Sequence, residues 1–359
     1  MTKAHEIWIG AYSAKDKVGI TRVELLPDTG ELIKTAEYGA IENPSFLSMN
    51  KEGTRLYAVC ETDSYDDGEG GHEEGGQLAS FPIDAETRKL GPGQYLPTHG
   101  NHPCHLSLTP SEDWLAVSNY NGASVMMYPI NPDKRPGPPA IRFRHTGTGP
   151  NEARQEAPHP HSVFFSPDGQ YLFVNDLGMD KVMVYTRGPE AHEWSAHDAI
   201  SLEPGAGPRH LAFHPSGKFI YVLNELDSTI TRISLEDPTK LVRLESISTL
   251  PDSYTEESWT AEILISKDGR FVYASNRGHD SIAVFNINEH TGELSSTGFV
   301  STRGKTPRNF ALTPDGQWLL AANQGSDSLV LFRIEPQSGL PIFTGTELSI
   351  STPVCVLIR

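Results

Sequence analysis

Four residues of the types used for proton transfer and anion binding stand at comparable places in a repeated pattern: His161, Arg209, Glu225 and Arg277. A histidine and a carboxylate can each exchange a proton with a reacting group. Arginine holds carboxylate or phosphate oxygens through its planar fork of N–H donors. These four residue types suit a reaction that combines proton transfer with the binding of an oxyanion.

Four more polar residues stand at matching positions and form the candidate substrate-binding set: His105, Glu262, Arg308 and Asn309. The turns of a β protein favour Gly, Asn, Asp and Ser, so turn chemistry does not explain the histidines, arginines and glutamates. Charged groups that converge on one opening must be paired or must bind something. A purely structural alternative is that Glu225 and Glu262 form salt bridges with the arginines.

The pattern that carries these residues occurs seven times. Its copies begin 59, 57, 48, 52, 47 and 46 residues apart, at the anchors Pro44, Pro103, Pro160, Pro208, Thr260, Pro307 and Pro353. Most copies place a turn glycine nine residues after the anchor and an asparagine sixteen after it, with short apolar runs rich in β-branched and aromatic residues between them. Four short strands per copy predict an all-β fold, a seven-bladed β-propeller. Residues just after the anchor and around the asparagine are then expected at one mouth.

The two ends of the chain complement each other. The last anchor is followed by a single apolar run, residues 354–358, while three further runs lie near the start, at residues 7–10, 19–25 and 32–38. We therefore expect the C-terminal strand to pair with the N-terminal strands and close the ring, which leaves no sheet edge open there. Because a propeller grows by repetition, residues 1–359 are expected to form a single domain.

Composition argues against several partners. The net charge is −17, from 29 basic and 46 acidic residues, and no run of Lys or Arg is present. Nucleic acid and anionic membrane surfaces are therefore not expected as partners. The start has no apolar stretch of signal-peptide length, and no run of 18 apolar residues occurs, so a cytoplasmic location is expected. Three cysteines at unrelated spacings imply no disulfide framework.

Two segments raise the question of a metal ion. Five histidines fall close together in two groups, His99, His102, His105, His159 and His161. Such spacings are weak signals, and no Cys or Asp stands at matching spacing, so we expect no catalytic metal and no cofactor. The acidic segment 61–76 matches no EF-hand spacing and is expected to be a solvated, flexible loop.

Six motifs together resemble the seven-bladed β-propeller lactonase family, which holds cycloisomerase-type 6-phosphogluconolactonases and carboxy-cis,cis-muconate cyclases. They are Ala157-Pro158-His159-Pro160-His161, Gly207-Pro208-Arg209-His210, Asn224-Glu225-Leu226, Ala261-Glu262-Ile263, Asn276-Arg277-Gly278 and Pro307-Arg308-Asn309-Phe310. The resemblance covers essentially the whole chain. It implies a metal-independent site at the propeller mouth, with His161, Arg209, Glu225 and Arg277 at the catalytic positions.

The expected activity is hydrolysis of a small anionic lactone, 6-phosphoglucono-1,5-lactone, a step of the pentose phosphate pathway. His161 or Glu225 would act as general base, Arg209 and Arg277 would stabilise the oxyanion, and Arg308 with Asn309 would hold the phosphate. One alternative is a lactonising cyclase, which needs the same kind of pocket. Another is a non-catalytic binding propeller, which would expose apolar patches where this mouth is polar.

Overall fold

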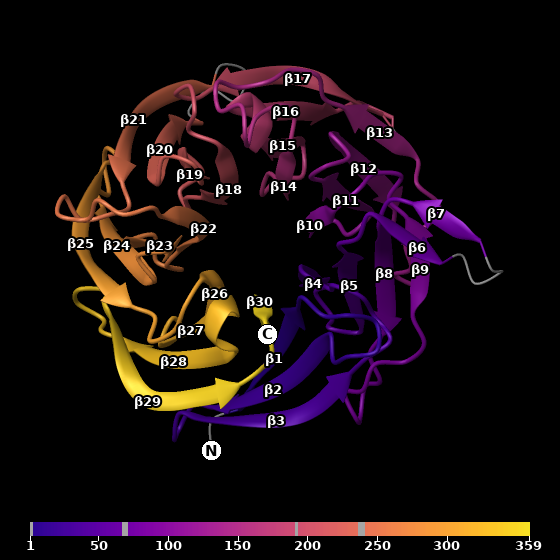
Figure 1. The fold of residues 1–359 in the computed structure, drawn as a ribbon, viewed down its shortest axis with the longest axis horizontal. Helices are drawn as coiled ribbons and strands as arrows, with labels where there is room; N and C mark the ends of the chain where they lie inside the picture. Colours follow the sequence, from indigo (N-terminus) through magenta and orange to yellow (C-terminus); the bar gives the residue numbers. More distant parts are fainter. Residues whose placement is uncertain (1–2, 67–70, 191–192, 236–240) are drawn as a thin grey trace. The chain divides into compact units, whose positions relative to one another are not determined.

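The computed structural model describes residues 3–66, 71–190, 193–235 and 241–359 (Figure 1). The chain divides into two compact units. The first unit comprises Met1–Tyr12, Val18–Gly39 and Pro208–Arg359, and the second comprises Ser13–Lys17 and Ala40–Gly207. That residues 1–359 behave as one domain stays a prediction.

The first unit contains four antiparallel sheets of four strands each. One combines both ends of the chain, in the order β3 (Glu31–Tyr38), β2 (Ile20–Leu26), β1 (His5–Ala11) and β30 (Pro353–Ile358). The other three follow chain order: β18 (Pro208–Phe213), β19 (Phe219–Asn224), β20 (Thr229–Ser234) and β21 (Val242–Ser248); β22 (Trp259–Ile265), β23 (Phe271–Arg277), β24 (Ser281–Ile287) and β25 (Leu294–Ser301); β26 (Pro307–Leu312), β27 (Trp318–Asn323), β28 (Ser328–Ile334) and β29 (Pro341–Ser349). A short 3₁₀ helix, η2 (Gln324–Ser326), follows β27.

The second unit contains three four-stranded antiparallel sheets and one hairpin. The sheets are β4 (Leu47–Met49), β5 (Arg55–Cys60), β8 (Gln77–Pro82) and β9 (Gln94–Pro97); β10 (Pro103–Leu108), β11 (Trp114–Asn119), β12 (Ser124–Pro129) and β13 (Ile141–Arg144); β14 (Pro160–Phe165), β15 (Tyr171–Asp176), β16 (Lys181–Arg187) and β17 (Trp194–Ser201). A 3₁₀ helix, η1 (Leu177–Met179), follows β15.

The acidic segment 61–76 differs from the expected loop. Its described part forms an antiparallel hairpin of β6 (Ser64–Asp66) and β7 (His72–Glu74). Backbone pairing across this hairpin explains why the polar composition did not prevent regular structure. Residues 67–70, which carry part of the predicted loop, lie outside the described residues.

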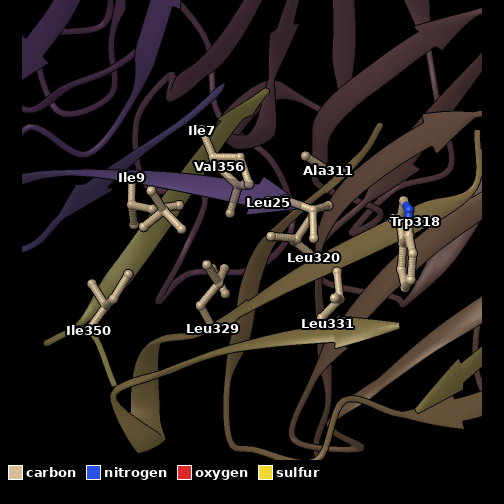
Figure 2. Packing of buried hydrophobic residues seen from close by; sticks show 12 residues of the cluster. Ile7, Ile9, Leu25, Ala311, Trp318, Leu320, Leu329, Leu331, Ile350 and Val356 are labelled. Atoms are coloured by element: carbon tan, nitrogen blue, oxygen red, sulfur yellow. The ribbon is translucent and has the colours of Figure 1, made fainter. Parts of the chain in front are cut away.

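The predicted closure by the C-terminal strand is confirmed. β30 pairs antiparallel with β1, in a register that runs from Ile7 opposite Ile358 to Ala11 opposite Pro353 (Figure 1). Figure 2 shows the core beneath this pairing, where Ile7, Ile9 and Val356 pack against residues of β27 and β28. The two chain ends are thus held by backbone hydrogen bonds and by a shared apolar core.

The burial of each strand explains its composition. β19 and β27 are buried at every residue, so both of their faces carry apolar side chains. The outermost strand β21 exposes most of its residues and alternates polar with apolar ones over much of its length. A strand that is covered on both faces has a continuous run of apolar residues. An edge strand with one face in solvent has polar and apolar residues in alternation.

The asparagine of the repeat has a structural role. Its Nδ2 donates to the backbone carbonyl of a threonine that follows an outer strand, in the pairs Asn119–Thr98, Asn276–Thr249 and Asn323–Thr302, at 3.1, 2.8 and 3.1 Å. In the same three copies Nδ2 also lies within 3.4 Å of a serine hydroxyl five residues later. The repeated asparagine therefore ties the turn to the neighbouring loop, as turn chemistry predicts.

Three of the innermost strands, β14, β18 and β26, have a β-bulge next to their first residue. In β18, Pro208 pairs with Asn224 and His210 with Leu223, which leaves Arg209 as the extra residue. The same register shift leaves His161 extra in β14 and Arg308 extra in β26. A bulge bends its strand and redirects a side chain. Three of the predicted site residues thus stand at bulged positions.

Candidate active site

Arg209 is the most constrained side chain of the candidate site. Its Nε donates to Glu225 Oε2 at 3.0 Å, and its Nη1 donates to the carbonyl oxygen of Ala261 and lies 3.3 Å from His210 Nε2. Only 3% of Arg209 and 4% of Glu225 is exposed. Contacts at three N–H positions fix the plane of the guanidinium group.

Glu225 binds a second arginine through the same oxygen. Arg277 Nη2 lies 3.0 Å from Glu225 Oε2 and donates to the carbonyl oxygen of Thr260 at 2.8 Å. Burial lowers the pKa of Arg277 to about 9; Glu225 opposes this shift, and the positive charges of Arg209 and Arg308 add to it. The Nε atom of Arg277 is buried and has no hydrogen-bond partner among the described residues. Salt bridging of Glu225 to the arginines is therefore confirmed.

Glu262 takes different partners from those expected. Its Oε1 lies 2.9 Å from His210 Nδ1 and accepts from the backbone N–H of Ile263 at 3.0 Å, while Asn309 Nδ2 donates to Oε2. Burial raises the pKa of Glu262 to about 7, against the opposing effects of Arg209 and the Ile263 N–H. In place of the alternative pairing with an arginine, Glu262 on β22 bonds a histidine of β18 and an amide of β26, the strands that pack on either side of it.

The contacts of His210 determine its tautomer. Arg209 Nη1 can only donate, so His210 Nε2 must accept, and the proton of the neutral ring is then on Nδ1, facing Glu262. Burial, followed by the charges of Arg209 and Arg308, holds the pKa of His210 well below its usual range. The imidazole is therefore a neutral link between a guanidinium and a carboxylate.

Arg308 lies beside Tyr12. Its Nη2 donates to the Tyr12 hydroxyl at 2.8 Å, and its Cζ is 5.2 Å from the centre of the Tyr12 ring. Arg308 is half-buried and thus more open to solvent than Arg209. With Arg209, Arg277 and the two glutamates, it gives this part of the first unit an excess of positive charge within an acidic protein. Such a local excess attracts anions.

Asn309 has both ends of its amide engaged. Nδ2 donates to Glu262 Oε2, and Oδ1 accepts from the backbone N–H of Val356 at 2.8 Å. Only 5% of the residue is exposed. These contacts favour a role in holding the site together, and its predicted contact with substrate stays a prediction.

His161 and His105 belong to the second unit. The ring of His161 meets Tyr120 edge to face at 5.5 Å between ring centres, and its carbonyl oxygen accepts from Ser118 Oγ at 3.1 Å. The ring of His105 lies between Phe46 and Phe164, with its centre 4.1 and 4.7 Å from theirs. His105 Nδ1 accepts from the Val163 N–H at 3.3 Å, a structural use of this atom.

The structure thus brings together six of the eight predicted site residues in the first unit, namely Arg209, Glu225, Arg277, Glu262, Arg308 and Asn309. The predicted grouping of His161 with Arg209 stays a prediction, as do the roles of all eight. His210 stands in one of the six motifs but is not among the eight predicted site residues, and Tyr12 belongs to neither group. His210 stands two residues after its anchor, as Glu262 and Asn309 do, and that spacing was a usable signal. No sequence signal pointed to Tyr12, because its partner Arg308 is 296 residues away in the sequence.

Within the described part of the chain, no group of three or more His, Cys, Asp or Glu side chains is arranged to hold a metal ion. Of the helices in that part, none is long and apolar enough to cross a membrane. The three cysteines are buried, and none of them forms a disulfide bond.

The whole chain matches a known family. Residues 6–358 match the family model described as "Lactonase, 7-bladed beta-propeller". The chain is 35% identical over 353 residues to the 6-phosphogluconolactonase of Bacillus subtilis (strain 168), with 97% of each chain covered. It is also similar in structure to the periplasmic gluconolactonase of Pseudomonas aeruginosa, with a TM-score of 0.90, 30% identity and 99% of each chain covered. The family description and the four-stranded sheets of the two units confirm the predicted seven-bladed β-propeller.

Proposed function

Because the chain belongs to the seven-bladed β-propeller lactonase family, we propose that it hydrolyses 6-phosphoglucono-1,5-lactone to 6-phosphogluconate. The name of the Bacillus subtilis relative supports this substrate, and the similarity extends over 97% of both chains. We place the reaction in the pentose phosphate pathway and in the cytoplasm. The periplasmic relative from Pseudomonas aeruginosa makes the location a point to test by fractionation.

In the proposed step, a water oxygen attacks the lactone carbonyl carbon and the bond between that carbon and the ring oxygen breaks. His161 takes the proton from the water and returns it to the ring oxygen, which leaves as a hydroxyl group. Arg209 and Arg277 stabilise the negative charge that develops on the carbonyl oxygen. Arg308 binds the phosphate.

One observation carries the proposal: Arg209 and Arg277 converge on a single oxygen of Glu225, each at 3.0 Å. Two buried guanidinium groups held in one place form an environment ready for an oxyanion, and they need no reorganisation when charge develops. Because Glu225 already accepts from both arginines on one oxygen, its contacts favour a role in orienting them. That leaves His161 as the general base of choice.

The test is the rate at which purified protein opens 6-phosphogluconolactone generated in place from glucose 6-phosphate, followed by phosphorus NMR. We expect a rate well above spontaneous hydrolysis, unchanged after dialysis against a chelator. A rate equal to the spontaneous one would overturn the proposal. A carboxy-substituted muconate, followed by its ultraviolet absorbance, tests the cyclase alternative.

The assignment of the base needs its own variants. His161→Ala is expected to lower kcat by roughly 100- to 10,000-fold, the usual contribution of a general base. His290→Ala, at an exposed position in the first unit, is the matched control and should leave the rate unchanged. If Glu225→Gln abolishes activity while His161→Ala does not, Glu225 is the base.

A further inference from the structure

One position of the repeat links successive sheets of the first unit. β18, β22, β26 and β30 pack beside one another in that order (Figure 1). Two residues after their anchors, the first three of these strands carry His210, Glu262 and Asn309, which are 3%, 6% and 5% exposed. Neither the family description nor the relatives' names assign a role to these residues.

The three side chains form a continuous line of hydrogen bonds, called here the positioning chain. At one end the Val356 N–H donates to Asn309 Oδ1, which leaves Asn309 Nδ2 to donate to Glu262 Oε2. At the other end Arg209 Nη1 donates to His210 Nε2, which leaves Nδ1–H to donate to Glu262 Oε1. Because each end is an obligatory donor, only one amide orientation and one tautomer satisfy every contact.

The positioning chain helps to fix the orientation of the Arg209 guanidinium group. The Nη1 group of Arg209 is held by His210 and by the Ala261 carbonyl oxygen, while Nε is held by Glu225. Burial keeps His210 neutral, so that its Nε2 stays an acceptor. A catalytic group needs neighbours that lock its geometry, because an error of about 1 Å can lower a rate roughly 100-fold.

We propose that His210, Glu262 and Asn309 are positioning residues that hold the Arg209 guanidinium in its working orientation and do not themselves contact substrate. The proposal rests on the proposed lactone hydrolysis for its effect on rate. Its effect on Arg209 is independent of that reaction. The earlier expectation that Glu262 and Asn309 bind substrate predicts a different result, a change in KM.

The first experiment compares two variants of one position, His210→Phe and His210→Gln. Phenylalanine fills the space without an acceptor, whereas glutamine can again offer an oxygen to Arg209. We expect His210→Phe to lower kcat about 100-fold with KM changed less than about 3-fold, and His210→Gln to recover at least about tenfold. His214→Phe, at the opposite end of the same sheet edge and bonded to Ser216 and Gly269, is the matched control and should keep the wild-type rate.

The second readout does not depend on activity. In protein with ¹⁵N-labelled arginine, the Nε–H resonance of Arg209, assigned with Arg209→Lys, should be protected from exchange in wild type and lose protection in His210→Phe. If His210→Phe fails to fold, Glu262→Gln serves instead. Its amide places an N–H against His210 or Asn309, and it should also reduce both kcat and protection.

Two results would overturn the proposal. One is an unchanged Arg209 resonance in the variants. The other is a rise in KM at constant kcat, which would show that these residues contact substrate. If wild type itself does not open the lactone, the proposed function fails, and the Arg209 resonance alone then decides whether the positioning chain acts as described.

Discussion

Arg277 lies 3.0 Å from Glu225 Oε2, the same oxygen that accepts from Arg209 Nε. The two arginines come from different sheets, on β23 and β18, and both are largely buried. Two buried cations that both contact one oxygen atom are close enough to repel each other. The negative charge of the Glu225 carboxylate between them is what permits their approach. The first unit therefore depends on Glu225 for its stability and for the charge of its site.

Replacing Glu225 with glutamine should lower the free energy of unfolding by about 3–5 kcal/mol, because it leaves two buried arginines without their counter-charge. Urea unfolding followed by tryptophan fluorescence measures the change. Asp268→Asn is the control, since it breaks an ion pair with Arg270 in which both side chains are more than half exposed, 54% and 52%. That change should be about 0–1 kcal/mol. Equal losses in the two variants would contradict the assigned role of Glu225.

The buried carboxyl of Glu262 should make stability depend on pH. Its pKa is raised from 4.5 to about 7, so the folded state binds this proton more tightly than the unfolded state does. The resulting stabilisation is complete below about pH 4.5 and is lost as pH rises through about 7, a decrease of about 3 kcal/mol. The positive charge of Arg209 and the backbone N–H of Ile263 oppose the rise in the pKa of Glu262, which burial causes.

Comparison with Glu262→Gln isolates this effect. The difference in unfolding free energy between wild type and variant should shift by about 3 kcal/mol between about pH 5 and about pH 8, with wild type relatively more stable at the acidic end. A difference that is constant with pH would show that Glu262 titrates at its ordinary value.

Arg308 should decide whether the phosphate of the substrate is recognised. Arg308→Leu is expected to lower kcat/KM for the phosphorylated lactone about 10- to 100-fold, the value of one charge-assisted hydrogen bond. The rate with glucono-1,5-lactone, which lacks the phosphate, should change less than about 3-fold. Tyr12→Phe, which removes the hydroxyl that binds Arg308, should have a smaller effect in the same direction. Equal losses on both lactones would place Arg308 at the reacting carbonyl.

The C-terminal strand should be essential for folding. Deletion of 353–359 removes β30 together with the buried side chains of Val354 and Val356, which are 3% and 7% exposed, and leaves the edge of β1 unpaired. Each buried side chain of this size contributes about 1.5–3 kcal/mol, so the truncated protein should unfold at much lower temperature or aggregate. Ser351→Ala, at an exposed position before β30, is the control. A truncated chain with the wild-type melting temperature would contradict this account.

Most of the fold could be predicted from the sequence, because strand order within each sheet follows local turn chemistry. The turn glycines and the asparagine of each copy recur at set distances from the anchor, and adjacent runs pair as hairpins. The hairpin of β6 and β7 was missed, since its strands are short and polar and carry no apolar alternation.

The candidate site could be predicted only in part. The positions of Arg209 and Arg308 followed from the repeat, because both lie next to an anchor, at a bulge. Their partners did not follow from it. Glu262 bonds His210 and Asn309, which are 52 and 47 residues away, and composition offers no means to rank those partners above an arginine.

The sequence by itself determined the repeating unit and the number of its copies, because these depend on interactions between neighbouring segments. It also determined the joining of the two chain ends, because the single run at the C-terminus completes the three runs near the start. Only the tertiary structure decided which charged groups pair. Hydrogen bonds and ion pairs act over about 3 Å, so the pairing depends on how adjacent sheets pack. That packing places Glu225 between two arginines and leaves Glu262 to bind His210 and Asn309.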